Sequence, residues 1–416
     1  MKTYTKKQIK NVVYSTDARQ IEGIATGVFF PRSEIEIQQI IRAGNNFVAR
    51  GAGSGLVGGS VPQNSVVIDL SKMNRILKFD KEKGEVEVEA GIILDELNDY
   101  LSRYGLEFPV NPSSHAICTI GGMIATNAVG SRAVKYGKTS NWLREIEVVD
   151  GNGNLLEIGK ADLSDFSGLE GITGIIVKAK LKLVEKKYRS ASLFKLDSVQ
   201  EAVSAARKLK MEKNVSMIEF FDKTVSSLFG LGESYHILTE FEGDEGNLKD
   251  KTYEEIMKIR DNTYPSLAAL GYVIIEDPKI FLERLPEFAE YLEKEKVPFF
   301  GHLGEGIIHP VFLKEDRKKI REMLIYVRKL HGKITGEHGI GLLKKEFVEE
   351  IDKKIYRRLK KRYDPECKIN CGKIFDYEKE ENKEDIVKKN ISEEANGVEI
   401  SEQENVNKDN EVKDES

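Results

Sequence analysis

Cysteine is scarce in this chain of 416 residues, which contains only Cys118, Cys367 and Cys371. A disulfide-stapled scaffold is therefore excluded, and because no apolar leader follows Met1 we expect no secretory signal and a reducing cytoplasm. Cys367 and Cys371 lie four positions apart, but without a second pair this spacing is too little for a structural zinc site. We therefore interpret both as structural residues.

Long apolar runs are also missing. No stretch of about 18 apolar residues occurs, so we expect no transmembrane segment. The hydrophobic fraction of 40% is nevertheless enough to build sizeable cores in two or three domains. We expect a cytoplasmic protein, with peripheral contact at the inner face of the membrane left open.

The net charge of -5 is distributed unevenly. Residues 376–416 carry fifteen acidic and six basic side chains, a net charge of -9, which leaves +4 on residues 1–375. This tail has one aromatic residue and no proline, so it cannot bury enough surface to offset its ordering entropy, and we predict that it is disordered. The alternative is a charged amphipathic helix that docks on a partner. The weakly basic body suits an anionic cofactor and substrate, and we expect no nucleic-acid partner.

Strand and helix patterns alternate along the body. From residue 27 to residue 185 they indicate a mixed α/β domain, and from about residue 190 to residue 312 they indicate a substrate or cap domain without a glycine-rich loop. Strand patterns cover residues 27–31, 47–50, 66–70, 174–184, 216–221 and 236–243, with hairpins at 76–91 and 145–159. Helical patterns cover residues 33–46, 94–105, 199–210, 281–295, 314–332 and 348–364.

A glycine-rich loop follows the strand pattern at residues 47–50. Its glycines, at positions 51, 53, 55, 58 and 59, would let backbone N–H groups approach an anion, which favours a pyrophosphate cradle over a ligand-free flexible loop. A Rossmann fingerprint is disfavoured because the loop runs into Gly-Gly-Ser-Val-Pro and because Asp69 follows Gly58 by only eleven residues. A P-loop is excluded since no Gly-Lys-Ser/Thr follows.

A second segment poor in bulky side chains extends from residue 113 to residue 131. Two surfaces of small residues in one domain predict a long, flat ligand that lies against the backbone, and a dinucleotide has that shape.

Histidines concentrate late in the chain. His302 and His309 stand in Gly-His-Leu-Gly-Glu-Gly-Ile-Ile-His-Pro, and Glu337 and His338 in Thr-Gly-Glu-His-Gly-Ile-Gly. Two imidazoles and one carboxylate can hold a divalent metal, which leaves His338 to act as a general base. The alternative is a set of turn histidines that cap backbone groups, which we prefer for His115, His236 and His331.

Several motifs together resemble the FAD-linked oxidases of the vanillyl-alcohol oxidase and p-cresol methylhydroxylase type, most closely the branch of glycolate oxidase FAD subunits and D-lactate or D-2-hydroxyacid dehydrogenases. The resemblance runs from about Tyr14 to Phe375. The motifs are FPRS at 30–33, RGAGSGLVGGSV at 50–61, IGGMIATNAVGSRAVKYGKT at 120–139, GLEGITGIIVKA at 168–179, GHLGEGIIHP at 301–310, GEHGIG at 336–341 and DPECKINCGK at 364–373.

This resemblance implies an α+β fold: a two-subdomain FAD-binding domain of the p-cresol methylhydroxylase type (residues 1–188), an antiparallel-sheet cap (189–330), a C-terminal helical segment that completes the FAD site (331–375), and the tail (376–416). The FAD is expected to be non-covalent, since Ala52 and Ser54 stand where covalent members place a linking histidine. The implied FAD-binding residues are Arg50, Gly51, Ala52, Gly53, Ser54, Gly55, Leu56, Gly59, Ser60, Pro109, Asn111, Ser113, Thr119, Gly121, Gly122, Ala125, Asn127, Gly130, Ser131, Ile176 and Asn370.

The resemblance also implies roles for the late histidines. His302, His309 and Glu337 match metal ligands (Zn, Mn or Fe), His338 matches the base, and Arg260 matches a clamp for the substrate carboxylate. Some members carry a lysine where this chain has Ile275, so we expect a small monocarboxylate and not a dicarboxylate.

The expected function is FAD-dependent oxidation of a small 2-hydroxy acid, of the D-lactate or glycolate type, with electrons passed to a quinone, a cytochrome or another non-NAD acceptor. An alternative is the FAD subunit of a glycolate oxidase-like complex that requires an iron-sulfur partner. A non-redox flavoenzyme, or a reductase of the cell-wall precursor type, is a third option that the histidine motifs disfavour.

Overall fold

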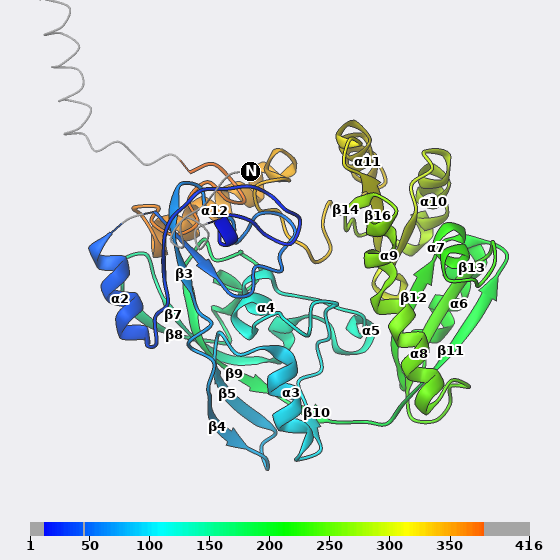
Figure 1. Cartoon of the computed structure of the whole chain (residues 1–416), viewed down its shortest axis with the longest axis horizontal. Coiled ribbons are helices and arrows are strands. Elements are labelled where there is room, and N and C mark those ends of the chain that lie inside the picture. Colours follow the sequence, from blue (N-terminus) through cyan, green and yellow to red (C-terminus); the bar gives the residue numbers. More distant parts are fainter. Residues whose placement is uncertain (1–11, 45, 378–416) are drawn as a thin grey trace, which may run out of the picture. The chain divides into compact units, whose positions relative to one another are not determined.

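The computed structural model describes residues 12–44 and 46–377, which contain three main sheets (Figure 1). The first is parallel, with strand order β1-β3-β2, and α2 follows β1. Helix α2 begins where Ser33 accepts the backbone N–H of Glu36, and Ile37 and Ile41 form its buried face, as the sequence predicts. The elements are β1 (Ala25–Phe29), α2 (Glu34–Ala43), β2 (Phe47–Arg50) and β3 (Ser65–Asp69).

The second sheet is antiparallel, with order β4-β5-β9-β7-β8. Both predicted hairpins are present in it: β4 pairs with β5, and β7 pairs with β8. In the second hairpin Oδ1 of Asp150 accepts the backbone N–H groups of Asn152 and Asn154, which closes the turn. The elements are β4 (Ile76–Asp80), β5 (Glu85–Glu89), α3 (Leu94–Ser102), β6 (Leu106–Glu107), α4 (Ile120–Thr126), α5 (Ala133–Tyr136), β7 (Leu143–Val149), β8 (Leu155–Gly159), β9 (Ile175–Lys182) and β10 (Val184–Glu185).

The third sheet, here called the cap sheet, is antiparallel throughout, with order β11-β13-β12-β15-β16-β14. One face packs on α6, α10 and α11, and the other packs on α7, α8 and α9. The elements are β11 (Arg189–Leu196), α6 (Val199–Leu209), β12 (Val215–Phe221), α7 (Lys223–Leu228), β13 (Tyr235–Glu242), α8 (Asp250–Asp261), α9 (Thr263–Ala269), β14 (Tyr272–Ile275), α10 (Leu285–Lys294), β15 (Phe299–His302), β16 (Ile307–Leu313) and α11 (Arg317–Lys329).

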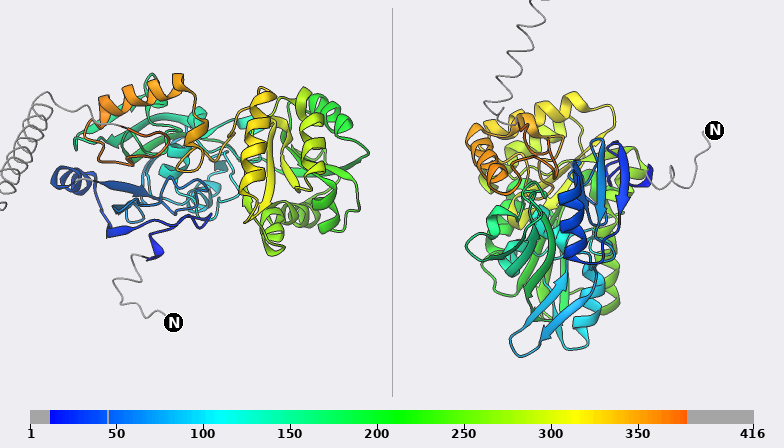
Figure 2. Two further views of the ribbon diagram at one scale, coloured as in Figure 1. Left: turned by 90° about the horizontal axis from the view of Figure 1, so that it is seen from above. Right: turned by 90° about the vertical axis from the view of Figure 1, so that its left-hand side faces the viewer.

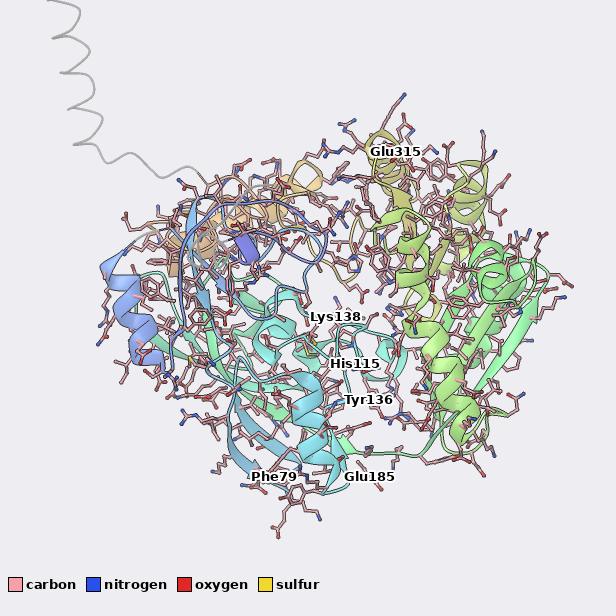
Figure 3. The ribbon with its side chains drawn as sticks, in the orientation of Figure 1. Phe79, His115, Tyr136, Lys138, Glu185 and Glu315 are labelled. Atoms are coloured by element: carbon pink, nitrogen blue, oxygen red, sulfur yellow. A yellow bond between two sulfur atoms is a disulfide. The ribbon has the colours of Figure 1, made fainter. Side chains whose placement is uncertain are left out.

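Ion pairs join the cap sheet to the residues before it. Arg132 lies 2.9 Å from Glu240 of β13, and Tyr136 of α5, labelled in Figure 3, hydrogen-bonds to Glu242. Arg189 at the start of β11 pairs with Glu107. Because Glu240 is fully buried, its carboxylate needs positively charged partners, which Arg132 and Arg189 supply. These ion pairs make the contact between the cap sheet and the residues before it specific.

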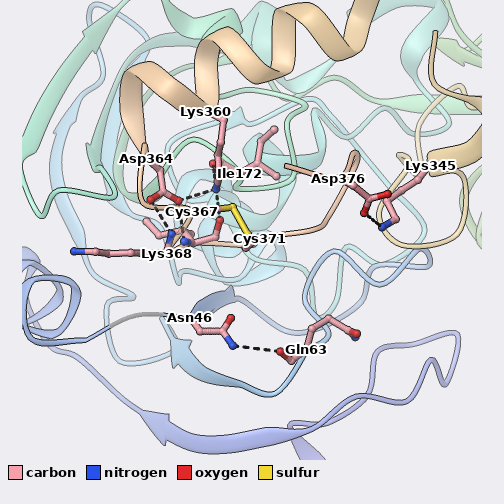
Figure 4. The surroundings of a disulfide bond; sticks show 11 residues. Asn46, Gln63, Ile172, Lys345, Lys360, Asp364, Cys367, Lys368, Cys371 and Asp376 are labelled. Carbon is pink, nitrogen blue, oxygen red and sulfur yellow. Dashed lines mark hydrogen bonds and ion pairs between the residues drawn. A yellow bond between two sulfur atoms is a disulfide. The ribbon is translucent and has the colours of Figure 1, made fainter. Parts of the chain in front are cut away.

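The chain then returns to its first sheet through α12 (Glu350–Tyr363), drawn in orange in Figure 2. After α12 the backbone of Lys368 and Asn370 hydrogen-bonds to Phe47 of β2. A disulfide joins Cys367 to Cys371 around these residues (Figure 4). The low cysteine count did not predict this disulfide, although it agrees with a structural role for both cysteines.

The predicted α+β arrangement of two subdomain sheets, an antiparallel cap sheet and a C-terminal helical segment is confirmed. The acidic tail lies outside the described residues, except for Asp376 and Tyr377. Among the described helices, none combines the length and the apolar character needed to cross a bilayer.

Candidate active site

A cavity of about 410 Å³ extends from the glycine-rich loop to the late histidines. Three parts of the chain form most of its wall: the segment from residue 49 to residue 60, the segment from residue 112 to residue 129, and cap residues with the Glu337–His338 pair. Ala18 and Glu170 complete the wall. Of the residues predicted to bind the cofactor, those in its wall are Gly51, Ala52, Gly53, Ser54, Gly55, Leu56, Gly59, Ser60, Ser113, Thr119, Gly122 and Ala125.

The glycine-rich loop packs too closely for side chains at some positions. A Cβ at Gly51 would lie 2.2 Å from Oγ1 of Thr119, and Gly53 and Gly58 have φ of +73° and +86°. At Gly55 an added Cβ would meet no heavy atom within 4 Å. Close packing explains glycine at position 51 and the positive φ explains it at positions 53 and 58, whereas position 55 adjoins open space in the cavity wall.

The facing wall is helix α4 and the residues before it. Oγ1 of Thr119 accepts the backbone N–H of Gly122 at 3.2 Å and caps the helix. Gly121 faces Ala90, whose Cβ would lie 2.7 Å from an added Cβ, so the helix packs tightly on the residues that follow β5. Small residues here bring the helix backbone close to the cavity.

Nine of the predicted cofactor residues lie outside the cavity wall. Several of them have contacts within the protein: Arg50 donates to the carbonyl of Thr16, Gly130 packs on the backbone of Asn111, and Ile176 is buried in β9. Asn370 donates from Nδ2 to the carbonyls of Gly59 and Glu170. The nine are Arg50, Pro109, Asn111, Gly121, Asn127, Gly130, Ser131, Ile176 and Asn370.

Two polar atoms in the cavity wall are buried and have no hydrogen-bond partner among the described residues: Oγ of Ser60 and Oε2 of Glu170. Buried polar groups are rarely left unpaired, so both atoms fit the environment of a bound polar molecule. Together with the open position at Gly55, they show that the cavity suits a cofactor with polar groups. The sequence reasoning missed Glu170.

The late histidines meet at the other end of the cavity. The Nε2 atoms of His302, His309 and His338 lie 3.6, 3.3 and 3.5 Å from Oε1 of Glu337. Ligand atoms of His302, His309 and Glu337 all lie within 4.8 Å of one another. The two imidazoles come from β15 and from β16, which pair side by side in the cap sheet.

Both imidazoles are held through their Nδ1 atoms. Nδ1 of His302 lies 2.5 Å from Oε1 of Glu219, and Nδ1 of His309 lies 3.1 Å from the carbonyl oxygen of Glu276. Each contact favours a proton on Nδ1 and leaves the Nε2 lone pair directed toward Glu337, as a metal ligand requires. Burial lowers the pKa of His302, but Glu219 and Glu337 outweigh it and raise that pKa to about 10. The two carboxylates therefore favour a positive charge on His302, and Nε2 offers its lone pair when a bound cation takes the place of the proton there.

His338 is held by a separate carboxylate, that of Asp277. Oδ1 of Asp277 lies 3.5 Å from Nδ1 of His338, and Nζ of Lys344 lies 2.6 Å from the same oxygen. Burial lowers the pKa of His338, whereas Asp277 and Glu337 raise it, and the net shift is upward. The ring of His338 stacks on that of His309 with a centroid separation of 5.3 Å.

Arg260 lies in the same wall, on α8, and its side chain is only 3% exposed. Its Nε lies 3.3 Å from Oε2 of Glu219, and its Nη1 lies 2.8 Å from Oδ1 of Asp261. The structure thus brings together every predicted metal-ligating and catalytic residue. Ile275 and Phe300 supply an apolar part of the wall.

The carboxylates that position these groups were missed from the sequence. Glu219 occurs in a run that reads as a buried strand, and Asp277 follows a short strand with no glycine beside it. A charged residue inside an apolar strand was the available signal, since an unpaired charge is costly to bury.

Comparison with known families supports the cofactor assignment. Residues 25–159 match the FAD binding domain family, and residues 244–374 match the C-terminal domain of FAD linked oxidases. The chain belongs to the FAD-linked oxidases. Its glycine-rich loop and α4 lie within the matched FAD binding domain, and His302, His309 and Glu337 lie within the matched C-terminal domain.

Curated relatives of this FAD-linked oxidase share about a quarter of its residues. A D-2-hydroxyglutarate dehydrogenase of Xanthomonas citri pv. viticola is 27% identical over 84% of this chain and 89% of its own length. Glycolate oxidase subunit GlcD of Bacillus subtilis is 28% identical over 88% and 92%. A D-lactate dehydrogenase of Archaeoglobus fulgidus is 28% identical over 83% and 90%.

Among solved structures, an alkyldihydroxyacetonephosphate synthase superposes with a TM-score of 0.66 at 17% identity, covering 88% of this chain and 82% of that one. At this identity the similarity shows the fold alone.

Proposed function

We propose that this FAD-linked oxidase oxidises a small 2-hydroxy acid to the 2-oxo acid. The observation that carries the proposal is the convergence of His302, His309, Glu337 and His338 with Arg260 at one end of the cavity that the FAD binding domain lines. The names of the curated relatives, which act on D-2-hydroxyglutarate, D-lactate and glycolate, support this substrate class.

In this proposal the substrate carboxylate binds Arg260, whose planar guanidinium suits a carboxylate. The 2-hydroxyl group lies beside His338, which accepts its proton at Nε2, while Asp277 holds Nδ1 of the same ring. FAD held non-covalently along the glycine-rich loop would supply the two-electron acceptor, at flavin N5, for the hydride from C2. The hydroxyl proton and this hydride together account for the two electrons and two hydrogens that the substrate loses.

His302, His309 and Glu337 also fit a divalent metal such as Zn, Mn or Fe, because they offer two bare imidazole nitrogens and one carboxylate oxygen around one point. A metal held there would polarise the substrate hydroxyl. Among the described hydrogen bonds, none joins these three residues to the glycine-rich loop. The proposed metal and FAD sites therefore use different residues.

Ile275 and Phe300 limit the substrate. Both are apolar, nearly buried and in the cavity wall, and neither can pair with a second carboxylate. Glycolate and D-lactate carry only a second hydrogen atom or a methyl group on C2, beside the hydroxyl and the carboxylate. Either therefore fits the proposal better than a dicarboxylate does.

The relationship to glycolate oxidase subunit GlcD supports a second proposal, that the chain works as the FAD subunit of a larger complex with an iron-sulfur partner. The two proposals share the same chemistry at the flavin and differ in the electron acceptor. Purification from the native host, followed by identification of co-purifying iron-sulfur proteins, separates them.

The main test is anaerobic bleaching of the bound flavin by a panel of 2-hydroxy acids. Glycolate and D-lactate are expected to bleach it, and D-2-hydroxyglutarate is expected to bleach it more slowly. His338→Ala is expected to slow bleaching at least about 100-fold, as loss of a general base does. His331→Asn, at an exposed histidine, is the matched control and should leave the rate unchanged. A flavin that no 2-hydroxy acid bleaches would overturn the proposal.

A further inference from the structure

Glu219 lies on β12, and its register partner on β15 is His302. Its side chain points to the face of the cap sheet that also carries Met217 and Phe221, where an apolar cluster packs on α8 and α9. The side chain is 1% exposed. A carboxylate in such a cluster is costly unless both oxygens are paired.

The two oxygens of Glu219 have different partners. Oε1 lies 2.5 Å from Nδ1 of His302, and Oε2 lies 3.3 Å from Nε of Arg260. These partners come from separate elements, β15 and α8, and both line the cavity. Glu219 itself lies behind the cavity wall, so it does not touch a bound substrate.

We propose that Glu219 is a positioning residue that joins the metal-ligating histidine to the clamp for the substrate carboxylate. The inference rests on the proposed function and adds a coupling between its two parts. A shift of Glu219 moves His302 and Arg260 together, so the metal and the substrate carboxylate are placed relative to each other by one side chain.

The chemistry of each contact explains how the coupling works. A proton on Nδ1 of His302, donated to Oε1, leaves Nε2 as a lone pair for a cation. Arg260 donates a hydrogen bond from Nε to Glu219 and another from Nη1 to Asp261. Neither contact uses Nη2. That nitrogen is left for the substrate carboxylate.

Glu219→Gln tests the coupling. A glutamine offers one oxygen and one N–H₂ group, so in either orientation a donor faces a donor, at Nδ1 of His302 or at Nε of Arg260. We expect metal affinity to fall about 10- to 100-fold, as for other changes beside metal-ligating histidines. We also expect the KM for the 2-hydroxy acid to rise.

Asp261→Asn is the matched control. Asp261 contacts Arg260 through Nη1 and has no contact with His302 among the described interactions. This variant is expected to raise the KM while leaving metal affinity at the wild-type value. A merely structural role for Glu219 would not produce that difference between the two variants.

The experiment is equilibrium dialysis of the flavin-loaded proteins against Zn²⁺, with the KM measured in parallel and folding checked by circular dichroism. If the wild type binds no Zn²⁺ at this site, both the proposed metal site and the proposed coupling are wrong. If the wild type binds Zn²⁺ and Glu219→Gln binds it equally well, only the role of Glu219 is wrong.

Glu219→Asp serves where the glutamine variant does not fold. Its carboxylate keeps the charge but is one methylene shorter, so it cannot span both partners. A loss of Zn²⁺ affinity together with a raised KM supports the coupling, and a wild-type value for either quantity overturns it.

Discussion

The carboxylate of Asp277 holds His338 through both of its oxygens: Oδ2 accepts the backbone N–H of His338 at 2.7 Å, and Oδ1 lies 3.5 Å from Nδ1 of its ring. Oδ2 also accepts the backbone N–H groups of Gly336 and Glu337 and the hydroxyl of Thr335. One fully buried side chain therefore fixes the whole turn that carries Glu337 and His338. Burial raises the pKa of Asp277, but Lys344 and His338 outweigh it, and the pKa lies far below its usual value.

Asp277→Asn is expected to lower kcat at least about 10-fold, with a smaller effect on KM, because it loosens the base rather than the carboxylate clamp. It also removes the carboxylate closest to Lys344, at 2.6 Å, while Glu276 at 2.9 Å keeps this lysine paired, so we expect a loss of about 1–3 kcal/mol in the free energy of unfolding. Flavin bleaching by stopped flow and urea unfolding measure the two effects.

Asp95→Asn is the control for this change, since Asp95 also pairs with a histidine, His115, labelled in Figure 3. These side chains are 44% and 31% exposed, so the pair should contribute less than about 1 kcal/mol. Equal losses of stability in the two variants would contradict the role given to Asp277.

Metal removal should separate the metal site from the flavin site. Dialysis against a chelator is expected to abolish bleaching by glycolate or D-lactate while the protein keeps its flavin absorbance, because His302, His309 and Glu337 form one end of the cavity and the glycine-rich loop forms the other. Added Zn²⁺ or Mn²⁺ should restore the activity. A protein shown to be metal-free that still bleaches at the original rate would remove the metal from the mechanism.

Gly55→Ala is expected to weaken FAD binding about 10-fold or more with little change in the stability of the FAD-free protein. The added Cβ meets no protein atom within 4 Å, and the residue lines the cavity, so the methyl group competes with the cofactor alone. Gly27→Ala is the matched control: its Cβ also meets no atom, but the residue is outside the cavity wall. Fluorescence titration of each apoprotein with FAD measures the two affinities. If Gly55→Ala binds FAD as tightly as Gly27→Ala does, the cofactor does not lie against Gly55.

Local signals predicted the elements well. Helix α2 could be predicted because Ser33 caps it and Ile37 and Ile41 repeat at helical spacing, and the β7–β8 hairpin because the Gly-Asn-Gly turn marks it. Both signals lie within a few residues of the structure they specify. The grouping of His302, His309 and Glu337 was predicted from their concentration late in the chain and then from the resemblance, because no local pattern places residues 302 and 337 together.

The partners of the supporting carboxylates could not be predicted for the same reason. Glu219 contacts residues 41 and 83 positions away, and Asp277 contacts residues about 60 positions away, so only the folded topology brings them together. Asn370, predicted to reach the flavin, donates from its side chain to the carbonyls of Gly59 and Glu170, which are 311 and 200 positions away, and so supports the glycine-rich loop.

Glu240 should make stability depend on pH in acid. Burial raises its pKa, but Arg132 and Arg189 outweigh it and lower the pKa to about 2. A pKa depressed on folding stabilises the protein above the unfolded-state value near 4.5, and this contribution, on the order of 3 kcal/mol, is lost as the pH falls toward 2.

Glu240→Gln is therefore expected to be less stable than the wild type at pH 7, because Arg132 loses its partner, and to show a shallower loss of stability between about pH 5 and pH 3. Urea unfolding across that range gives both quantities. Parallel curves for the two proteins would contradict the assignment.

The Cys367–Cys371 disulfide closes a five-residue loop that bonds to two parts of the N-terminal region: Lys368 and Asn370 to the backbone of Phe47, and the Asn370 side chain to Gly59. Reduction, or the double variant C367S/C371S, is expected to lower the free energy of unfolding by about 2 kcal/mol from loop entropy. FAD affinity should fall as well, since the support of Gly59 weakens. Unfolding and FAD titration with and without dithiothreitol measure both effects, and the reductant should change nothing in the double variant. If it changes nothing in the wild type either, the disulfide does not hold the loop.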